Sequence, residues 1–138
     1  MPNPPHLFTP DEAGALLPQI QSLIEQLQGL RQSLAKTEQE LETLRIKLSA
    51  GNGYPIDELR TQEHKLAEHQ LDLAQAFHSA AEQLESLGCL LKDLDRGLVD
   101  FYSLRDGEIV FLCWKLGEEG IRYWHGVEDG FDGRRPLA

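Results

Sequence analysis

The sequence has few of the residues on which disulfide-rich and membrane proteins depend. It contains 2 cysteines among 138 residues, Cys89 and Cys113, which indicates neither a disulfide framework nor a paired-cysteine metal motif. No apolar run approaches the length of a transmembrane helix, and Met1 to Pro5 lacks the basic and apolar segments of a secretory signal. We therefore expect a cytoplasmic protein with no membrane partner.

Basic residues are also scarce. The 13 Lys and Arg are outnumbered by 23 Asp and Glu, which gives a net charge of −10 at pH 7. An acidic chain without a basic cluster repels both phosphate backbones and anionic lipid headgroups. The charge therefore argues against nucleic acids and membrane surfaces as partners.

Familiar catalytic motifs are missing as well. The sequence has no glycine-rich phosphate loop, no Gly-x-Ser-x-Gly elbow and no His-Glu-x-x-His motif. His64, Glu68 and Asp72 follow one another at steps of four, which is not the Glu-x-x-His spacing of a di-iron bundle. These absences favour a protein that is not an enzyme.

A helical pattern occupies the first third of the chain. Apolar residues recur there at alternating steps of three and four, which is a heptad seam with one polar interruption, Thr37. Thr9 and Glu12 form a capping-box pattern in front of it. We expect one helix over 9–50. The seam consists of Leu16, Ile20, Leu23, Leu27, Leu30, Leu34, Leu41, Leu44 and Leu48.

A second seam follows a glycine-rich reversal at 51–53 and predicts a helix over 55–88. The short connection makes the two helices antiparallel neighbours. Glu63 and Gln70 interrupt the second seam, so one hairpin does not fully cover both apolar stripes. We therefore expect a homodimer that is joined through the helices. The second seam consists of Leu59, Leu66, Leu73, Phe77, Ala80, Leu84 and Leu87.

The hydrophobic period changes from helix to strand after Gly88. Three short segments rich in β-branched and aromatic residues predict a small antiparallel sheet over 98–125. Asp106-Gly107 is a two-residue hairpin signal. A tight turn there pairs Tyr102 with Phe111 and Asp100 with Cys113. A four-residue turn at Gly117–Gly120 is expected to join the next pair of strands.

This register divides the side chains of the sheet between two faces. The predicted core face holds Val99, Phe101, Val110, Leu112, Trp114, Leu116, Ile121, Tyr123 and His125. The other face mixes polar and aromatic groups, as binding surfaces do: Asp100, Tyr102, Ile109, Phe111, Cys113, Lys115, Arg122 and Trp124.

The predicted fold class is α+β, with a long antiparallel two-helix coiled hairpin followed by a small three-stranded antiparallel sheet. One domain spans 1–138. Its parts are a flexible N-terminus (1–8), the two helices and a small β tail (89–138).

The tail also carries a resemblance to a known family. The chain resembles a bacterial family known only as a domain of unknown function, the 2203 family, from Phe8 to Pro136. The resemblance implies a small bacterial protein and supplies neither an activity nor a catalytic residue. The segments that carry it are Lys92 to Phe101 (KDLDRGLVDF), Leu112 to Glu118 (LCWKLGE), Tyr123-Trp124-His125 and Gly130 to Pro136 (GFDGRRP).

Carboxylates and one histidine are the metal-ligating types in the tail. Asp95, Asp100 and His125 are the candidates for a divalent cation, because oxygen ligands and an imidazole can converge on one ion. Short Asp side chains also make turns, and no compact ligand motif is present. We therefore predict no metal and no other cofactor. For His125 we favour a partly buried ring that is hydrogen-bonded to a backbone group or a carboxylate.

Neither cysteine is predicted to be a nucleophile. Asp100 lies opposite Cys113, and a nearby carboxylate raises the pKa of a thiol. Both Cys113 and Cys89 are therefore interpreted as core residues.

The function that we expect is a non-enzymatic cytoplasmic interaction module. It associates with itself through the helical hairpin and presents the β tail to a ligand or protein partner. The alternative is a metal-dependent or small-ligand enzyme that uses tail carboxylates and His125. The ligand-binding candidates lie at strand ends and glycine turns, where sites are commonly built: Asp95, Asp100, Glu118, Trp124, His125 and Arg134.

Overall fold

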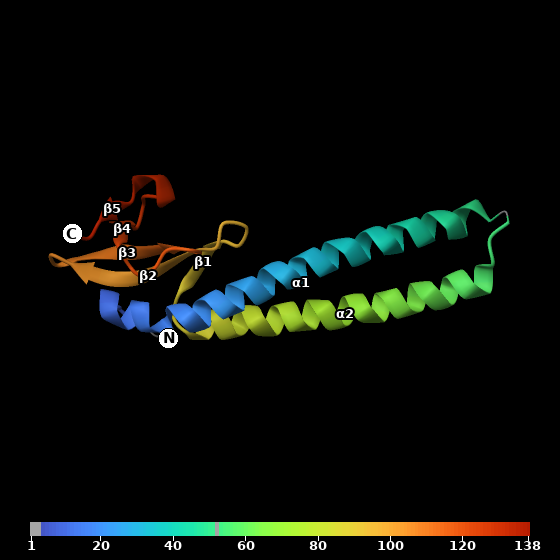
Figure 1. Ribbon diagram of the computed structural model, residues 1–138, viewed down its shortest axis with the longest axis horizontal. Helices are drawn as coiled ribbons and strands as arrows, with labels where there is room; N and C mark the ends of the chain where they lie inside the picture. Colours follow the sequence, from blue (N-terminus) through green and yellow to red (C-terminus); the bar gives the residue numbers. More distant parts are fainter. Residues whose placement is uncertain (1–3, 52) are drawn as a thin grey trace. The chain divides into compact units, whose positions relative to one another are not determined.

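The computed structural model describes residues 4–51 and 53–138 and shows an α+β fold with two long helices and one antiparallel sheet (Figure 1). Helix α1 spans Pro10–Ala50 and helix α2 spans Ile56–Ser86, close to the predicted ranges. The chain forms two compact units. The sheet unit contains the chain up to Glu25 together with Ala81–Ala138, and the hairpin unit is Gln26–Ala80. In the described chain, neither helix is long and apolar enough to cross a membrane.

Helix α1 begins with the predicted capping box. The Thr9 amide donates to Glu12 Oε1 at 3.0 Å, and the Glu12 amide donates to Thr9 Oγ1 at 3.1 Å. The hydrogen bonds with Thr9 lower the pKa of Glu12, because they favour the ionised carboxylate. The local sequence therefore fixes where this helix starts.

The hairpin unit pairs its two helix segments along the predicted seams. Leu41, Leu44 and Leu59 are buried there. Thr37, the polar interruption of the first seam, is also buried, and its hydroxyl donates to the Ser33 carbonyl at 2.8 Å. This bond within the helix satisfies the hydroxyl, so the interruption does not break the seam.

The polar interruptions of the second seam form cross-helix contacts. Gln70 Nε2 donates to Glu38 Oε2 at 2.6 Å, and Glu63 Oε2 lies 3.5 Å from Arg45 Nε. Polar groups thus join the helices at the positions where the leucine pattern lapses.

The sheet has five strands, so the prediction of three was wrong. The strands lie in sequence order, β1-β2-β3-β4-β5, and each pair of neighbours is antiparallel. The two edge strands were missed because β1 is short and charged and β5 has only two residues, one of them proline. The strands are β1 (Leu90–Asp93), β2 (Leu98–Arg105), β3 (Glu108–Lys115), β4 (Tyr123–Gly126) and β5 (Arg135–Pro136), with a 3₁₀ turn at Phe131–Gly133.

The central hairpin has the predicted turn and register. Asp106 and Gly107 adopt φ values of 51° and 81°, as a two-residue turn of this type requires. Across the turn, Tyr102 faces Phe111 and Asp100 faces Cys113. The Asp-Gly signal therefore placed every residue pair of these two strands.

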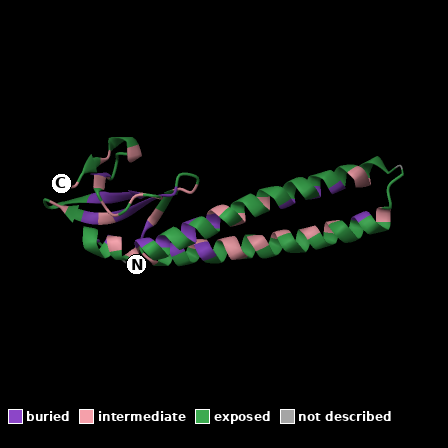
Figure 2. Cartoon of the chain, viewed as in Figure 1, coloured by how far each residue is buried: buried purple, intermediate pink, exposed green. Residues whose placement is uncertain are grey.

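Buried residues gather on the strands of this hairpin (Figure 2), and one of its faces forms the core of the sheet unit. Val99, Phe101, Leu112 and Trp114 are almost completely buried, as predicted. Phe8, just before α1, is also buried and packs edge-on against Phe101 with ring centroids 5.1 Å apart.

Two hydrogen bonds attach the segment before α1 to β2. The Phe8 amide donates to the Tyr102 carbonyl at 2.7 Å, and Ser103 Oγ donates to the Phe8 carbonyl at 2.6 Å. The predicted flexible segment 1–8 therefore ends in a residue that is held on the sheet. Its first three positions lie outside the described residues.

The predicted face of β4 was wrong. His125 pairs with Phe111, and Tyr123 pairs with Cys113, so both side chains lie on the face of Asp100 rather than on the core face. The connection runs from Leu116 to Arg122 and is longer than the predicted Gly117–Gly120 turn. A shift of one residue in register moves every side chain of a strand to the other face.

Candidate functional site

Three polar side chains converge on the face of the sheet opposite the core. Asp100 on β2, Cys113 on β3 and His125 on β4 come from adjacent strands. They are 3%, 2% and 3% exposed. One ligand atom from each lies within 4.8 Å of the other two. Buried polar groups are costly unless they are paired, so this triad is a specific feature of the fold.

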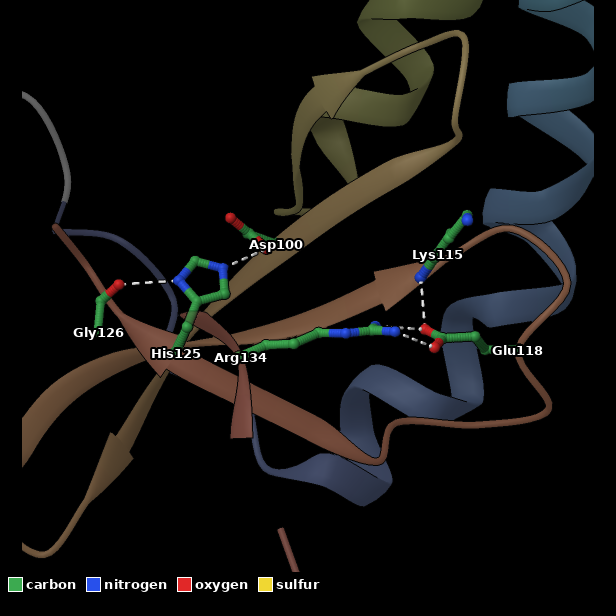
Figure 3. Close-up of polar contacts among 6 residues, drawn as sticks. All are labelled: Asp100, Lys115, Glu118, His125, Gly126 and Arg134. Atoms are coloured by element: carbon green, nitrogen blue, oxygen red, sulfur yellow. Dashed lines mark hydrogen bonds and ion pairs between the residues drawn. The ribbon is translucent and has the colours of Figure 1, made fainter. Parts of the chain in front are cut away.

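The imidazole of His125 is held by two neighbours (Figure 3). Its Nδ1 lies 2.8 Å from the Gly126 carbonyl oxygen, and its Nε2 lies 3.1 Å from Asp100 Oδ1. A carbonyl oxygen can only accept, so Nδ1 carries a hydrogen and donates it. The expected hydrogen bond from His125 to a backbone group is therefore confirmed. The ring is more deeply buried than predicted, and its Nε2 faces the Asp100 carboxylate.

A cavity of about 260 Å³ lies above the triad. Its lining comes from the strand face and from the β1–β2 and β4–β5 connections. The lining contains two cationic side chains and three carboxylates, so the net charge of the cavity favours a positively charged ligand. The lining residues are Lys92, Asp93, Arg96, Leu98, Asp100, Phe111, Cys113, His125, Val127, Asp129, Gly130 and Phe131.

The two cations of the cavity lining have partners of their own. The Arg96 side chain donates to Asp93 Oδ2 at 3.1 Å. The Lys92 ammonium lies 4.8 Å from the centroid of the Phe111 ring. Since both cations are engaged in this way, they do not form an open anion-binding cluster.

Burial, and after it the carboxylate of Asp100, raise the pKa of the Cys113 thiol to about 11. The guanidinium of Arg134 lowers it in part. A thiol in this environment is a poor nucleophile, in agreement with the interpretation from the sequence. Burial also raises the pKa of Cys89 to about 11, and the Cys89 thiol lies 3.5 Å from the Leu84 carbonyl.

Glu118 and Arg134, two of the predicted ligand-binding residues, bind each other (Figure 3). Arg134 Nη1 donates to Glu118 Oε1 at 3.0 Å, and Arg134 Nη2 lies 2.8 Å from Oε2. Glu118 Oε1 also accepts from the Lys115 amide at 2.8 Å. The guanidinium carbon lies 4.0 Å from the centroid of the Tyr123 ring and 4.1 Å from that of Phe131. This pair therefore anchors the C-terminal segment on the sheet.

The structure separates Trp124 and Asp95 from the triad. Trp124 pairs with Leu112 and lies on the core side of the sheet, with Arg105 and Arg135 at 4.8 and 5.5 Å from its ring centroid. Asp95 is exposed in the connection between β1 and β2 and does not line the cavity.

Cys113 is the site residue that the sequence interpretation missed. The predicted register already placed Cys113 beside Asp100, so two members of the triad could be found from the sequence. The signal was lost because His125 was predicted to lie on the core face. The candidate metal ligands in the structure are Asp100, Cys113 and His125, so Cys113 replaces the predicted Asp95.

Comparison with known proteins gives one match. The family model described as "Uncharacterized conserved protein (DUF2203)" matches residues 6–137. No curated protein and no solved structure matches the chain. The matched region includes both helices, the whole sheet and the triad.

Proposed function

Because the chain belongs to this family of uncharacterised conserved proteins, we propose its function from its own geometry, as a non-enzymatic ligand-binding module of the bacterial cytoplasm. The ligand site is the cavity on the sheet, and the helical hairpin mediates self-association. The observation that supports this proposal is the buried triad of Asp100, Cys113 and His125 at the base of the cavity. A sheet face that served only as scaffold would be more stable with apolar residues there.

The size and charge of the cavity limit what it can bind. A volume of about 260 Å³ is below the range of roughly 300–1,000 Å³ that is usual for drug-sized ligands. The carboxylates of Asp93, Asp100 and Asp129 outnumber the cations of Lys92 and Arg96. The ligand is therefore small and positively charged, or a small molecule that carries a cation.

Ligand binding should raise the melting temperature of the wild type, and a side chain at position 130 should reduce the effect. Gly130 lines the cavity, has extended backbone with φ −99°, and has no atom within 4 Å of an added Cβ. Gly130→Val should therefore fold normally and occupy part of the cavity. The measurement is a thermal-shift panel with divalent cations and small organic cations, in which nucleotides and phosphorylated metabolites serve as anions that should give no shift.

Gly120→Val is the matched control. Gly120 also has open space around an added Cβ but lies outside the cavity, so this variant should keep the full ligand-induced shift. A panel in which nothing stabilises the wild type would refute the ligand site. So would equal shifts in the two glycine variants.

Self-association is proposed for the hairpin unit, with a second copy of the chain as partner. Leu34, Leu66, Leu73 and Phe77 are seam residues that remain only half-buried in one chain. Two helices leave the open flank of a heptad seam to solvent, whereas four helices enclose it. A second copy of the chain presents a seam with the same heptad periodicity. Antiparallel hairpins can pair with their own copies around a twofold axis.

Leu34→Asp should shift the protein from dimer to monomer in sedimentation equilibrium. Leu34 is half-buried in one chain and would become fully buried between two copies, where an unpaired charge is strongly unfavourable. Leu27 is completely buried within the chain, so Leu27→Asp should unfold the hairpin instead.

Leu104→Asp makes the same chemical change on the sheet, at a side chain that is 58% exposed, and should leave the dimer intact. A wild type that sediments as a compact monomer at micromolar concentrations would refute self-association.

A further inference from the structure

We propose that Asp100, Cys113 and His125 form a three-ligand site for a divalent transition-metal ion, with Zn²⁺ as the ion that fits best. The inference rests on the proposed function of the cavity and names its ligand. All three residues are buried on adjacent strands, and their ligand atoms lie within 4.8 Å of one another.

The donor atoms select the class of metal. A carboxylate oxygen, a thiolate sulfur and an imidazole nitrogen are together the ligand types of Zn²⁺. Mg²⁺ and Ca²⁺ bind oxygen ligands almost exclusively and would leave Cys113 without a role. The sulfur atom therefore distinguishes this site from the oxygen-rich cation site that was considered from the sequence.

The orientation of His125 suits a ligand. Nδ1 donates its hydrogen to the Gly126 carbonyl, so in the neutral imidazole the lone pair is on Nε2. Metal-ligating histidines commonly have the second ring nitrogen bonded to a carbonyl or carboxylate in this way, because the bond fixes the tautomer and the ring plane. Nε2 points toward Asp100, the next member of the triad.

Nε2 of the neutral ring and Asp100 Oδ1 are both acceptors, and they lie 3.1 Å apart. Two lone pairs at that distance repel unless a positive charge lies between them. A metal ion supplies that charge and coordinates both atoms. A proton would supply it too, as a buried imidazolium–carboxylate pair, and that is the competing explanation.

The dimensions also fit a tetrahedral ion. Bond lengths of about 2.0–2.3 Å place neighbouring ligand atoms of a tetrahedral zinc site about 3.3–3.7 Å apart. The Asp100–His125 distance is close to this range, and no separation in the triad exceeds it by more than about 1 Å. Small side-chain rotations therefore bring the three atoms onto one ion.

All three ligand residues line the cavity, so a water molecule or a small ligand within it can supply the fourth ligand. On metal binding, Cys113 Sγ exchanges its hydrogen for the metal, and the proton leaves to solvent. Arg134 is the nearby cation, and its charge is neutralised by the two-point contact with Glu118. The site thus accepts a divalent charge without an unpaired cation beside it.

Cobalt titration of the full chain tests the proposal. Chelator-treated, reduced protein is titrated with Co²⁺. The expected result is a near-ultraviolet thiolate-to-cobalt charge-transfer band together with strong visible bands of tetrahedral cobalt, all displaced by one equivalent of Zn²⁺. A cobalt spectrum without a thiolate band in the wild type would overturn the proposal, because no other described cysteine lies in the triad.

Cys113→Ser and Cys89→Ser form a matched pair of variants. Both cysteines are buried, and only Cys113 lies in the triad. Cys113→Ser should abolish the charge-transfer band and weaken Zn²⁺ binding by at least about 100-fold, since even the loss of an outer-shell partner weakens metal binding about 10–100-fold. Cys89→Ser should change neither, and loss of the band in Cys89→Ser would contradict the assignment. If Cys113→Ser fails to fold, the spectrum of the wild type decides.

The thermal-shift panel separates this inference from the proposed function. If a small organic cation stabilises the wild type but not Gly130→Val, and Co²⁺ gives no thiolate band, then the cavity binds a ligand and the metal site is refuted. If no compound or cation in the panel binds, both are refuted.

Discussion

Replacing Trp114 with alanine should lower the free energy of unfolding of the sheet unit by about 3–5 kcal/mol, the range for truncating a large aromatic residue in a core. Trp114 is 1% exposed and lies on the core face, opposite Val99. Its Nε1 also donates to the Glu118 carbonyl at 3.0 Å, and the truncation leaves this partly buried acceptor without its partner. The measurement is urea unfolding followed by the fluorescence of the remaining tryptophan.

Trp124→Ala is the control for the same truncation at a less buried site. Trp124 is only half-buried, pairs with Leu112, and lies beside the guanidinium groups of Arg105 and Arg135. Its loss should cost about 1 kcal/mol, as expected for exposed cation–π contacts and partial burial. Equal unfolding midpoints for the two variants would show that the core does not depend on Trp114.

Gly97→Ala should destabilise the sheet unit by about 2–5 kcal/mol, although it adds only one methyl group. Gly97 has φ +66°, which costs a non-glycine residue about 1–2 kcal/mol. The added Cβ would also lie 2.5 Å from Leu116 Cβ, an atom close to the backbone that cannot rotate away. Overpacking of this kind typically costs about 1–3 kcal/mol. The Leu116 amide donates to the Gly97 carbonyl at 2.9 Å, so relief of the clash would break this bond.

Gly120→Ala provides the comparison, because an added Cβ there meets no atom within 4 Å and the backbone is not in the left-handed region. It should alter the unfolding free energy by no more than about 0.5 kcal/mol. Both variants can be compared by urea unfolding with tryptophan fluorescence. A Gly97→Ala protein as stable as Gly120→Ala would show that the contact between the β1–β2 turn and Leu116 is not rigid.

The sequence was most informative where the structure depends on neighbours along the chain. The heptad seams and the capping box at Thr9 predicted both helices, because each helix is stabilised by residues three and four positions apart. Asp106-Gly107 predicted the register between β2 and β3, because the geometry of a two-residue turn fixes which residues face each other.

The errors arose where the fold depends on longer connections. The segment from Leu116 to Arg122 contains no turn signal that determines its length, so the face of β4 could not be derived from its own pattern. His125 was therefore predicted to lie in the core, and the triad was not recognised. Phe8 was missed for a similar reason, since one aromatic residue in a proline-rich segment has no periodicity that predicts a partner on β2.

The attachment of Phe8 to β2 also has a consequence for the order of folding. The bond from Ser103 to the Phe8 carbonyl spans 95 residues, and the sheet unit is built from both sides of the hairpin unit. Closing so long a loop in a disordered chain is entropically unfavourable, and the cost increases with the logarithm of loop length. An early helical hairpin, formed from local contacts, shortens that loop by bringing Glu25 and Ala81 within reach of each other.

During synthesis the sheet unit cannot be completed until β2 leaves the ribosome, so Phe8 and the apolar side of the first helical turns stay uncovered while the hairpin is made. The hairpin is thus an insertion in the sheet unit, and removing one heptad from each helix in register should leave the sheet and its triad unchanged.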